Sequence, residues 1–307
     1  MSIVNAEKTA NYISKWISDY ATKAGAKALV LGLSGGIDSA LVALLCKATK
    51  FPLVCVNMPC HSSASAFNRA EAFAKEQNIR LFKVDLSDAH KVINDQFNAS
   101  GLNFQSDIPY DWESKGSAGA LRSCLRAPTL SFLAHATNGI IMGTGNRSED
   151  HITRYYQKFG DGCVDISPIA DLFKSEVYEL FEFLCQDKNG TMAPGAQAIY
   201  DAKPSADLWG ADAGQEDEKE LGISYDEEEW GDRENMRTEK KGYGIFKDKP
   251  GIIFDESDPA KHSAFVGYTA RQKEVIAKMW SMEKSSRHKE NPALPVCKVR
   301  DAGDMVK

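Results

Sequence analysis

The stretch "LVLGLSGGIDSALVALL" (29–45) joins two apolar runs through a short glycine-rich turn. The first run has the length of a buried strand, whereas the second is too long for a strand and predicts a helix. The turn, Ser34 to Ser39, would then open a helix, where unpaired N–H groups and the helix dipole favour an anion. Gly35 and Gly36 allow the main chain to approach a phosphate closely, and the two serines add hydroxyl donors. The segment therefore predicts a phosphate-binding turn between a strand and a helix.

Asp38 is an unexpected residue in such a turn, because its carboxylate would repel a phosphate. A magnesium ion that bridges the carboxylate and the phosphate oxygens removes this conflict. The alternative is a plain strand-to-helix turn in which Asp38 or Ser39 only caps the helix. The chain has no G-x-x-x-x-G-K-[ST] segment, so the lysine of a Walker loop is missing. This absence favours a loop that holds pyrophosphate as a leaving group.

The rest of the first half alternates between strand and helix patterns. Apolar runs at 27–33, 52–59, 79–87 and 139–146 predict strands, and amphipathic or small-residue runs at 13–24, 39–50, 63–78 and 125–138 predict helices. This order predicts an α/β fold, a doubly wound parallel sheet with helices on both faces. Further helices are expected at 171–189 and 263–288, while residues 190–249 are polar and weakly periodic. We expect a single domain over 1–307, in which 190–249 forms loops and an insertion; a disordered linker is the alternative.

Composition narrows the class of protein. The chain has 307 residues, 43% of them hydrophobic and 26% charged, with a net charge of -6, which is typical of a soluble globular protein and argues against a nucleic-acid partner. The seven cysteines include no C-x-x-C pair and are expected to be reduced thiols. No apolar run reaches the length of a membrane span, and the amino terminus lacks the unbroken apolar core of a signal peptide. We therefore expect a cytoplasmic protein with no membrane partner.

The turn resembles the loop of the PP-loop ATP pyrophosphatase superfamily, whose adenine nucleotide alpha hydrolase-like members adenylate an oxygen and release pyrophosphate. Three later stretches resemble successive signatures of NAD synthetase within that superfamily. They are "MGTGNRSEDHITRYYQKFGDGCVDISPIADLFKSEV" (142–177), "KPSADLWGADAGQEDEKELGISYDE" (203–227) and "SSRHKENPALPV" (285–296). The resemblance implies a magnesium-dependent ligase of NAD biosynthesis that amidates deamido-NAD with ATP and ammonia, through an acyl-adenylate, and releases AMP and pyrophosphate.

The resemblance also implies roles for individual residues. Asp38 and Lys174 would be catalytic, and Asp38 and Glu149 would bind Mg²⁺. The expected ATP-binding residues are Ser34, Gly35, Gly36, Ile37, Asp38, Ser39, Thr144, Lys174 and Ser205. The expected deamido-NAD-binding residues are Arg126, Lys158, Asp165, His288 and Lys289.

Departures from the family pattern leave some positions open. Counting from Thr144 selects Glu149 as the second metal ligand, whereas counting back from "QKFGD" selects Asp150. An R-x-R pair of the family is replaced by Arg122 and Arg126, which share a helix face at i and i+4, and Arg126 is the preferred candidate. Residues around 230–262 have no functional interpretation.

The resemblance further implies a homodimer with the deamido-NAD pocket at the interface. Free ammonia is the expected nitrogen source, since the chain carries no nitrilase-like amidase domain, although a separate amidotransferase subunit stays open. Two other functions also stay open. One is another PP-loop adenylating enzyme, either RNA-modifying or a guanylate-type synthetase, and the other is a nucleotide-binding homologue that has lost catalysis.

Overall fold

The computed structural model describes residues 3–101, 115–205, 216–240, 267–290 and 293–301. At its centre lies a four-stranded sheet in the order β3-β2-β1-β4, and every pair of neighbouring strands is parallel. The strands are β1 (Ala28–Gly32), β2 (Leu53–Asn57), β3 (Leu81–Lys83) and β4 (Gly139–Ile141). All four coincide with strand patterns in the sequence, which confirms the predicted parallel sheet.

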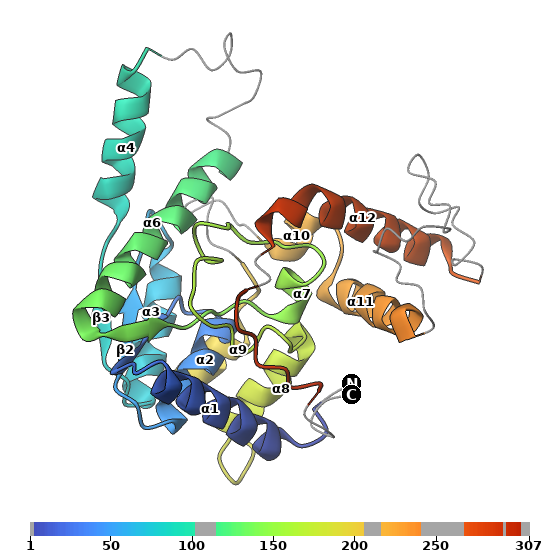
Figure 1. Cartoon of the computed structure of the whole chain (residues 1–307), viewed down its shortest axis with the longest axis horizontal. Coiled ribbons are helices and arrows are strands. Elements are labelled where there is room, and N and C mark those ends of the chain that lie inside the picture. The colour runs from blue at the N-terminus through green and yellow to red at the C-terminus, as the bar shows by residue number, and fades with distance from the viewer. Residues whose placement is uncertain (1–2, 102–114, 206–215, 241–266, 291–292, 302–307) are drawn as a thin grey trace.

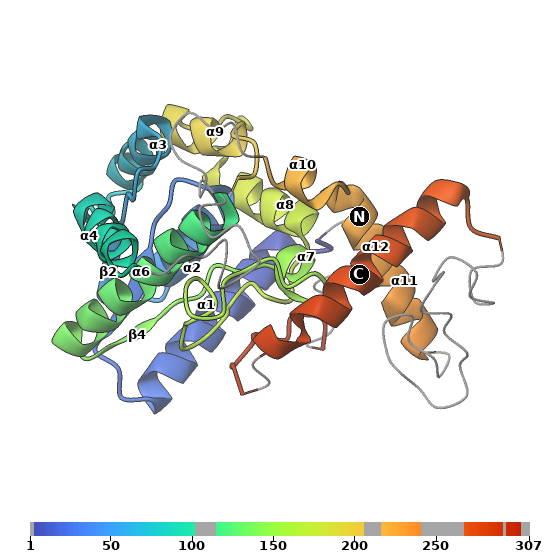
Figure 2. The ribbon, with the colours of Figure 1, turned by 90° about the horizontal axis from the view of Figure 1, so that it is seen from above.

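Helices connect and cover these strands (Figures 1 and 2). They are α1 (Ala6–Lys23), α2 (Ile37–Ala48), α3 (Ala64–Glu76), α4 (Ser87–Ala99), α6 (Lys115–Thr137), α7 (Arg147–Asp150), α8 (Lys174–Cys185), α9 (Pro194–Tyr200), α10 (Asp217–Leu221), α11 (Tyr225–Lys240) and α12 (Ala270–Ser286). A short 3-10 turn, Arg287–Lys289, follows α12.

The two faces of the sheet pack against different helices, because alternate strand residues point to opposite sides. Leu29 and Leu31 of β1 lie in the larger core with residues of α1, α2 and α8. Val30, between them, packs in a separate core with Leu130 and Ala134 of α6. The sheet is therefore covered on both faces, as expected for a doubly wound fold.

The strand order fixes where a ligand binds. From β1 the chain passes through α2 to β2 on one side, whereas β4 pairs with β1 on the other side. The order therefore reverses between β1 and β4, and open α/β sheets bind ligands beyond the carboxyl ends of the strands at such a reversal. The Ser34–Ser39 turn follows β1, and Thr144 follows β4, so both lie at this place.

The expectation of loops over 190–249 is wrong for the part that the structure describes. Helices α9, α10 and α11 lie in this range, and α11 contacts α12, beside which it lies in Figure 1. The helical pattern was obscured because α11 carries many acidic residues and few apolar ones. Residues 206–215 and 241–266, including most of the uninterpreted 230–262 stretch, lie outside the described residues. Within the described ranges, no helix combines the length and the apolar character that a membrane span needs.

Candidate active site

The Ser34–Ser39 turn is held by hydrogen bonds between its own residues. The Ser34 N–H donates to Ser39 Oγ at 3.1 Å, the two serine hydroxyls lie 3.0 Å apart, and the Gly36 N–H donates to Ser34 Oγ at 3.2 Å. Gly35 has φ +91°, and a Cβ atom there would lie 2.2 Å from the Ala66 carbonyl oxygen. Only glycine fits this position, so the turn keeps its N–H groups at the start of α2.

The Asp38 side chain does not cap α2. Instead it reaches across to Lys174, whose ammonium nitrogen lies 2.6 Å from Asp38 Oδ2 and 2.7 Å from Glu149 Oε1. Lys174 is the first residue of α8 and is 4% exposed. Residues from three separate elements therefore converge on one point beside the turn, and the two carboxylates share one cation.

Asn146, in the loop after β4, connects the Asp38 carboxylate to the main chain of Glu149. Its side-chain amide donates to Asp38 Oδ1 at 2.9 Å, and its side-chain oxygen accepts the Glu149 N–H at 3.1 Å. The second bond caps α7, the short helix that carries Glu149. The separation between Asp38 and Glu149 is thus fixed by a side chain of the "GTGN" turn.

The pKa shifts in this cluster follow from burial and from one ammonium shared by two carboxylates. Burial disfavours ionisation of Glu149, but the adjacent Lys174 ammonium outweighs it and holds the pKa of Glu149 below its usual value. For Asp38 burial wins over the same ammonium, and its pKa is raised. Burial also acts against the charge of Lys174, yet the two carboxylates raise its pKa above the ordinary value. Lys174 therefore stays protonated.

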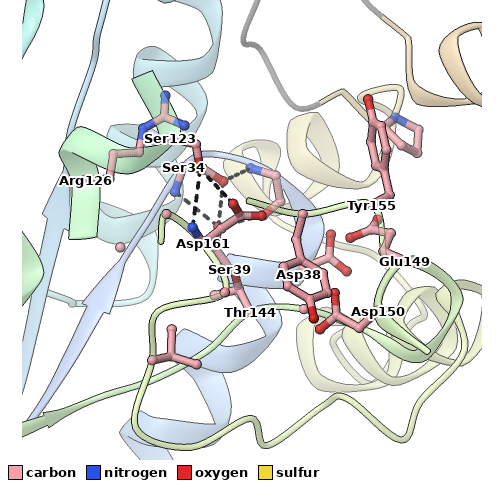
Figure 3. Close-up of a pocket in the computed structure, with 18 of the residues that line it drawn as sticks. Ser34, Asp38, Ser39, Ser123, Arg126, Thr144, Glu149, Asp150, Tyr155 and Asp161 are labelled. Atoms are coloured by element: carbon pink, nitrogen blue, oxygen red, sulfur yellow. Dashed lines mark hydrogen bonds between the residues drawn. The ribbon is translucent and has the colours of Figure 1, made fainter. Parts of the chain in front are cut away.

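Asp150, the alternative metal ligand, lines the same cavity and lies near Asp38 and Glu149 (Figure 3). Its carboxylate packs against Gly145, where a Cβ atom would lie 1.8 Å from Asp150 Oδ2. Burial and the nearby Glu149 charge raise the pKa of Asp150 well above its usual value. Glu149, and not Asp150, shares the Lys174 ammonium with Asp38, and the choice of the second metal ligand stays a prediction.

A large cavity extends from the turn across the carboxyl edge of the sheet (Figure 3). Its volume is about 820 Å³, at the upper end of the range for small-molecule sites. Most of the predicted site residues line it, namely Ser34, Gly36, Ile37, Asp38, Ser39, Arg126, Thr144, Glu149, Lys158, Lys174, Ser205 and Lys289. Figure 3 shows Ser123, Asp161 and Arg126 on the opposite side of the turn from Glu149 and Tyr155.

The structure brings only part of the predicted deamido-NAD set into this cavity. Arg126 lines it, and its Nε donates to the Met58 carbonyl at 3.4 Å; Arg122 is not among the lining residues. Lys158 donates to the main-chain carbonyl of His288 at 2.8 Å, which ties the 3-10 turn to the cavity wall. His288 is itself not a lining residue.

Lys289 and Asp165 mainly contact main-chain groups. The Lys289 ammonium donates to the carbonyls of Arg154 and Tyr156, at 3.0 and 2.7 Å. Burial lowers the pKa of Lys289. Asp165 accepts the Ile141 N–H at 2.7 Å at the end of β4 and does not line the cavity. Its contact with a dinucleotide stays a prediction.

Three features of the site were missed from the sequence. Asn146 lies in the 142–177 stretch and caps α7. An asparagine directly before a helix is a capping signal, so this role could have been predicted. The Tyr225 hydroxyl donates to Glu149 at 2.8 Å, and no local pattern connects these residues. Ser123 donates to Asp161 at 2.7 Å, and the flanking glycines of "FGDG" were the only sign that this turn is special.

The carboxylate pair fits a magnesium ion. The Lys174 ammonium already occupies a cation position between two carboxylates, and Mg²⁺ typically takes one or two carboxylates together with phosphate oxygens and water. Within the described residues no cluster of three or more His, Cys, Asp or Glu could hold a metal without other ligands. Asp38 and Glu149 would therefore hold the ion only together with a phosphate.

A parallel sheet whose reversal point carries a glycine turn, a buried lysine and two converging carboxylates defines a nucleotide-binding α/β protein with a site for phosphoryl chemistry. The family model described as NAD synthase matches residues 9–230. The chain is 34% identical over 230 residues to the NH(3)-dependent NAD(+) synthetase of Syntrophomonas wolfei, covering 73% of this chain and 83% of that one. The chain belongs to the NAD synthase family and is thus a ligase. This membership decides against the RNA-modifying and guanylate-type alternatives.

Solved structures agree with this fold over nearly the whole chain. NMN synthetase from Francisella tularensis aligns with a TM-score of 0.69 at 26% identity, covering 94% of this chain and 98% of that chain. The NH3-dependent NAD synthetase of Campylobacter jejuni aligns with a TM-score of 0.64 at 19% identity, covering 95% and 99%. The second likeness supports the fold alone.

Proposed function

We propose that this chain makes NAD from deamido-NAD, ATP and ammonia, the activity that its homology to NH(3)-dependent synthetases assigns. The observation that carries the residue assignment is the Lys174 ammonium held between Asp38 and Glu149 beside the Ser34–Ser39 turn. This arrangement combines N–H groups for a pyrophosphate with one cation and two metal-binding carboxylates.

In the first half-reaction a nicotinate carboxylate oxygen attacks the α-phosphorus of ATP, and the bond to the β-phosphate oxygen breaks. The products are an acyl-adenylate and pyrophosphate. The Ser34–Ser39 turn would bind the leaving pyrophosphate through its N–H and hydroxyl groups. Thr144 and Ser205, which line the same cavity, would bind ATP. Bound Mg²⁺ would supply positive charge against the phosphate oxygens, with Asp38 and Glu149 as its protein ligands.

Lys174 has a second task in this proposal. Its ammonium neutralises the two carboxylates when no metal is bound, and an arriving phosphate gives it a new partner. The free cation then donates to the phosphate oxygens, where negative charge grows as the pyrophosphate leaves. The side chain changes partner within the same site, so the carboxylates are never left without a cation.

In the second half-reaction ammonia attacks the carbonyl carbon of the acyl-adenylate, and the bond to the AMP oxygen breaks. One proton leaves the nitrogen, and NAD and AMP are formed. Arg126 and Lys158 both line the cavity, Arg126 on the side away from Glu149 (Figure 3), and would bind the deamido-NAD phosphates. His288, Lys289 and Asp165 are retained as further candidates for this substrate.

The experiment is incubation of the purified protein with ATP, Mg²⁺, deamido-NAD and ammonium, with NAD, AMP and pyrophosphate followed together. Equal yields of all three support the proposal. Release of ADP and phosphate would contradict it, and no turnover would leave a homologue that has lost catalysis. A parallel arm uses nicotinic acid mononucleotide, because the Francisella tularensis relative is an NMN synthetase. A higher kcat/KM for the mononucleotide would make it the preferred substrate and leave the proposed reaction steps unchanged. Glutamine in place of ammonium, with no other protein, should give no product.

We further propose a cytoplasmic homodimer. All seven cysteines are free thiols in the structure, as suits a reducing compartment. Phe132 of α6 is 72% exposed, and Phe97 and Val92 of the neighbouring α4 are 49% and 59% exposed. Such apolar groups on adjacent helices suit a subunit interface. Sedimentation should give twice the chain mass, and Phe132→Glu should shift it toward the monomer; a wild-type monomer would refute the dimer.

A further inference from the structure

The Tyr225 hydroxyl connects Glu149 to a second carboxylate. Its oxygen lies 2.8 Å from Glu149 Oε1 and 3.1 Å from Asp217 Oδ2. Tyr225 begins α11 and Asp217 begins α10, and the two side-chain positions are 7% and 5% exposed. The Lys174 ammonium also lies 5.2 Å from the centre of the Tyr225 ring. The tyrosine therefore contacts both the carboxylate and the ammonium of the Asp38–Lys174–Glu149 cluster.

A phenol carries one proton and can donate only one hydrogen bond at a time. The Tyr225 hydroxyl lies within hydrogen-bond distance of both Glu149 and Asp217, so the two carboxylates accept from the same group. Two buried carboxylates on different elements thereby fix where the Tyr225 oxygen lies.

Glu149 Oε1 accepts from Lys174 and from Tyr225 at the same time. When the ammonium leaves for a phosphate, the Tyr225 hydroxyl is the side-chain donor that still holds this oxygen in place. A flexible glutamate without that bond would have to lose rotamer freedom on binding the ion, whereas a fixed one is organised in advance.

We propose that Tyr225 and Asp217 are positioning residues that hold Glu149 in the orientation that Mg²⁺ needs. The inference rests on the proposed function, because it takes Glu149 as a metal ligand. It adds that the α10–α11 segment, far from the glycine turn in sequence, sets the affinity of the metal site.

The test measures metal affinity directly, with Mn²⁺ as the probe. Free Mn²⁺ is followed by electron paramagnetic resonance during titration of the full-length protein saturated with α,β-methylene-ATP. Tyr225→Phe removes one oxygen and should weaken Mn²⁺ binding about tenfold, as expected for loss of a hydrogen bond to a charged group. Tyr268→Phe is the matched control, because its hydroxyl also donates to a part-buried glutamate, Glu234, farther along α11. It should leave Mn²⁺ affinity unchanged.

Asp217 variants test whether its contact with Tyr225 matters. Asparagine keeps a hydrogen-bonding group beside the Tyr225 hydroxyl, so Asp217→Asn should stay within about twofold of wild type in Mn²⁺ affinity, whereas Asp217→Ala should match Tyr225→Phe. Thermal unfolding of each variant establishes that it is folded. If Asp217→Ala binds Mn²⁺ as wild type does, Asp217 has no positioning role.

Glu149→Gln separates this inference from the proposed function. If Glu149→Gln binds Mn²⁺ as wild type does, the metal assignment itself fails. If Glu149→Gln loses Mn²⁺ while Tyr225→Phe binds normally, the metal site stands and the positioning role is refuted.

Discussion

The side-chain ammonium of Lys174 lies 2.6 Å from the carboxylate of Asp38, although 136 positions separate the two residues in the chain. Asp38 follows β1, and Lys174 begins α8 on the same side of the sheet. The contact places the cation where a phosphate held by the Ser34–Ser39 turn would also find it. We therefore expect the binding of ATP and of the metal to be linked, since both change the partners of Lys174.

Asp38→Asn should abolish adenylation and leave dinucleotide binding largely intact. The amide keeps the shape of the side chain but loses the charge that pairs with Lys174 and with a metal. Adenylation is measured as AMP formation, and deamido-NAD binding is measured by calorimetry without ATP. If the variant adenylates deamido-NAD at near the wild-type rate, the role of Asp38 is wrong.

Glu149→Gln and Asp150→Asn should differ sharply in metal dependence. Glu149 shares the Lys174 ammonium with Asp38, whereas Asp150 packs against Gly145. We expect the Mg²⁺ concentration for half-maximal rate to rise at least tenfold in Glu149→Gln and to change little in Asp150→Asn. The opposite ranking would move the metal ligand by one residue.

Lys174→Met should weaken both the fold and the reaction. Removing the cation leaves two largely buried carboxylates without a counter-charge, and a buried ion pair that loses one member costs about 3–5 kcal/mol. Mg²⁺ with ATP should restore part of this stability, because the metal brings a new cation to the same oxygens. Urea unfolding with and without Mg²⁺·ATP measures both effects.

Lys47→Met is the control for that variant. Lys47 is exposed on α2 and donates only to the Gln77 carbonyl, so its removal should change stability by less than about 0.5 kcal/mol. Equal destabilisation of the two variants would show that the Asp38–Lys174–Glu149 cluster adds nothing specific.

Glu228→Gln should stabilise the protein at alkaline pH. Glu228 is 1% exposed, and within the described residues neither of its carboxylate oxygens accepts a well-formed hydrogen bond. Burial therefore raises the pKa of Glu228 from 4.5 to about 8. Between these values the unfolded chain loses a proton that the folded chain keeps, so the wild type loses roughly 1.4 kcal/mol of stability per pH unit and levels off above pH 8.

Urea unfolding at pH 5 and pH 8 measures this difference, and the variant should gain on the wild type as pH rises. Glu227→Gln is a control on the same helix, because a hydrogen bond from Arg271 lowers the pKa of Glu227 to about 2. That carboxylate is ionised in both states above pH 5 and gives no such slope. A pH-independent effect of Glu228→Gln would show that the carboxyl is not held protonated.

The sheet and its glycine turn were predictable because their signals are local. Leu29–Leu45 contains a complete strand, turn and helix, and the left-handed φ at Gly35 requires the residue that the sequence shows. The order β3-β2-β1-β4 was not predicted, because alternating strands and helices are compatible with several strand orders. Helices α10 and α11 were not predicted. α10 has only five residues, and α11 has few apolar residues and packs through contacts with α12.

The site was predictable only as a set of candidates. Asp38, Glu149 and Lys174 were named from separate stretches, but their convergence depends on where β1 ends, where α7 lies and where α8 begins in space. The choice between Glu149 and Asp150 depends on a one-residue difference in counting, and in the structure Glu149 is the one that contacts Lys174. Asp165 bonds the Ile141 main chain, and its contact with a dinucleotide stays a prediction.

The central step of the proposed reaction is attack by the substrate carboxylate at the α-phosphorus of ATP. Deamido-NAD labelled with ¹⁸O in its nicotinate carboxylate tests this step when the products of one turnover are analysed by mass spectrometry. The account predicts that one labelled oxygen appears in AMP and none in pyrophosphate or phosphate. Label in inorganic phosphate, or in none of the phosphorus products, would contradict it.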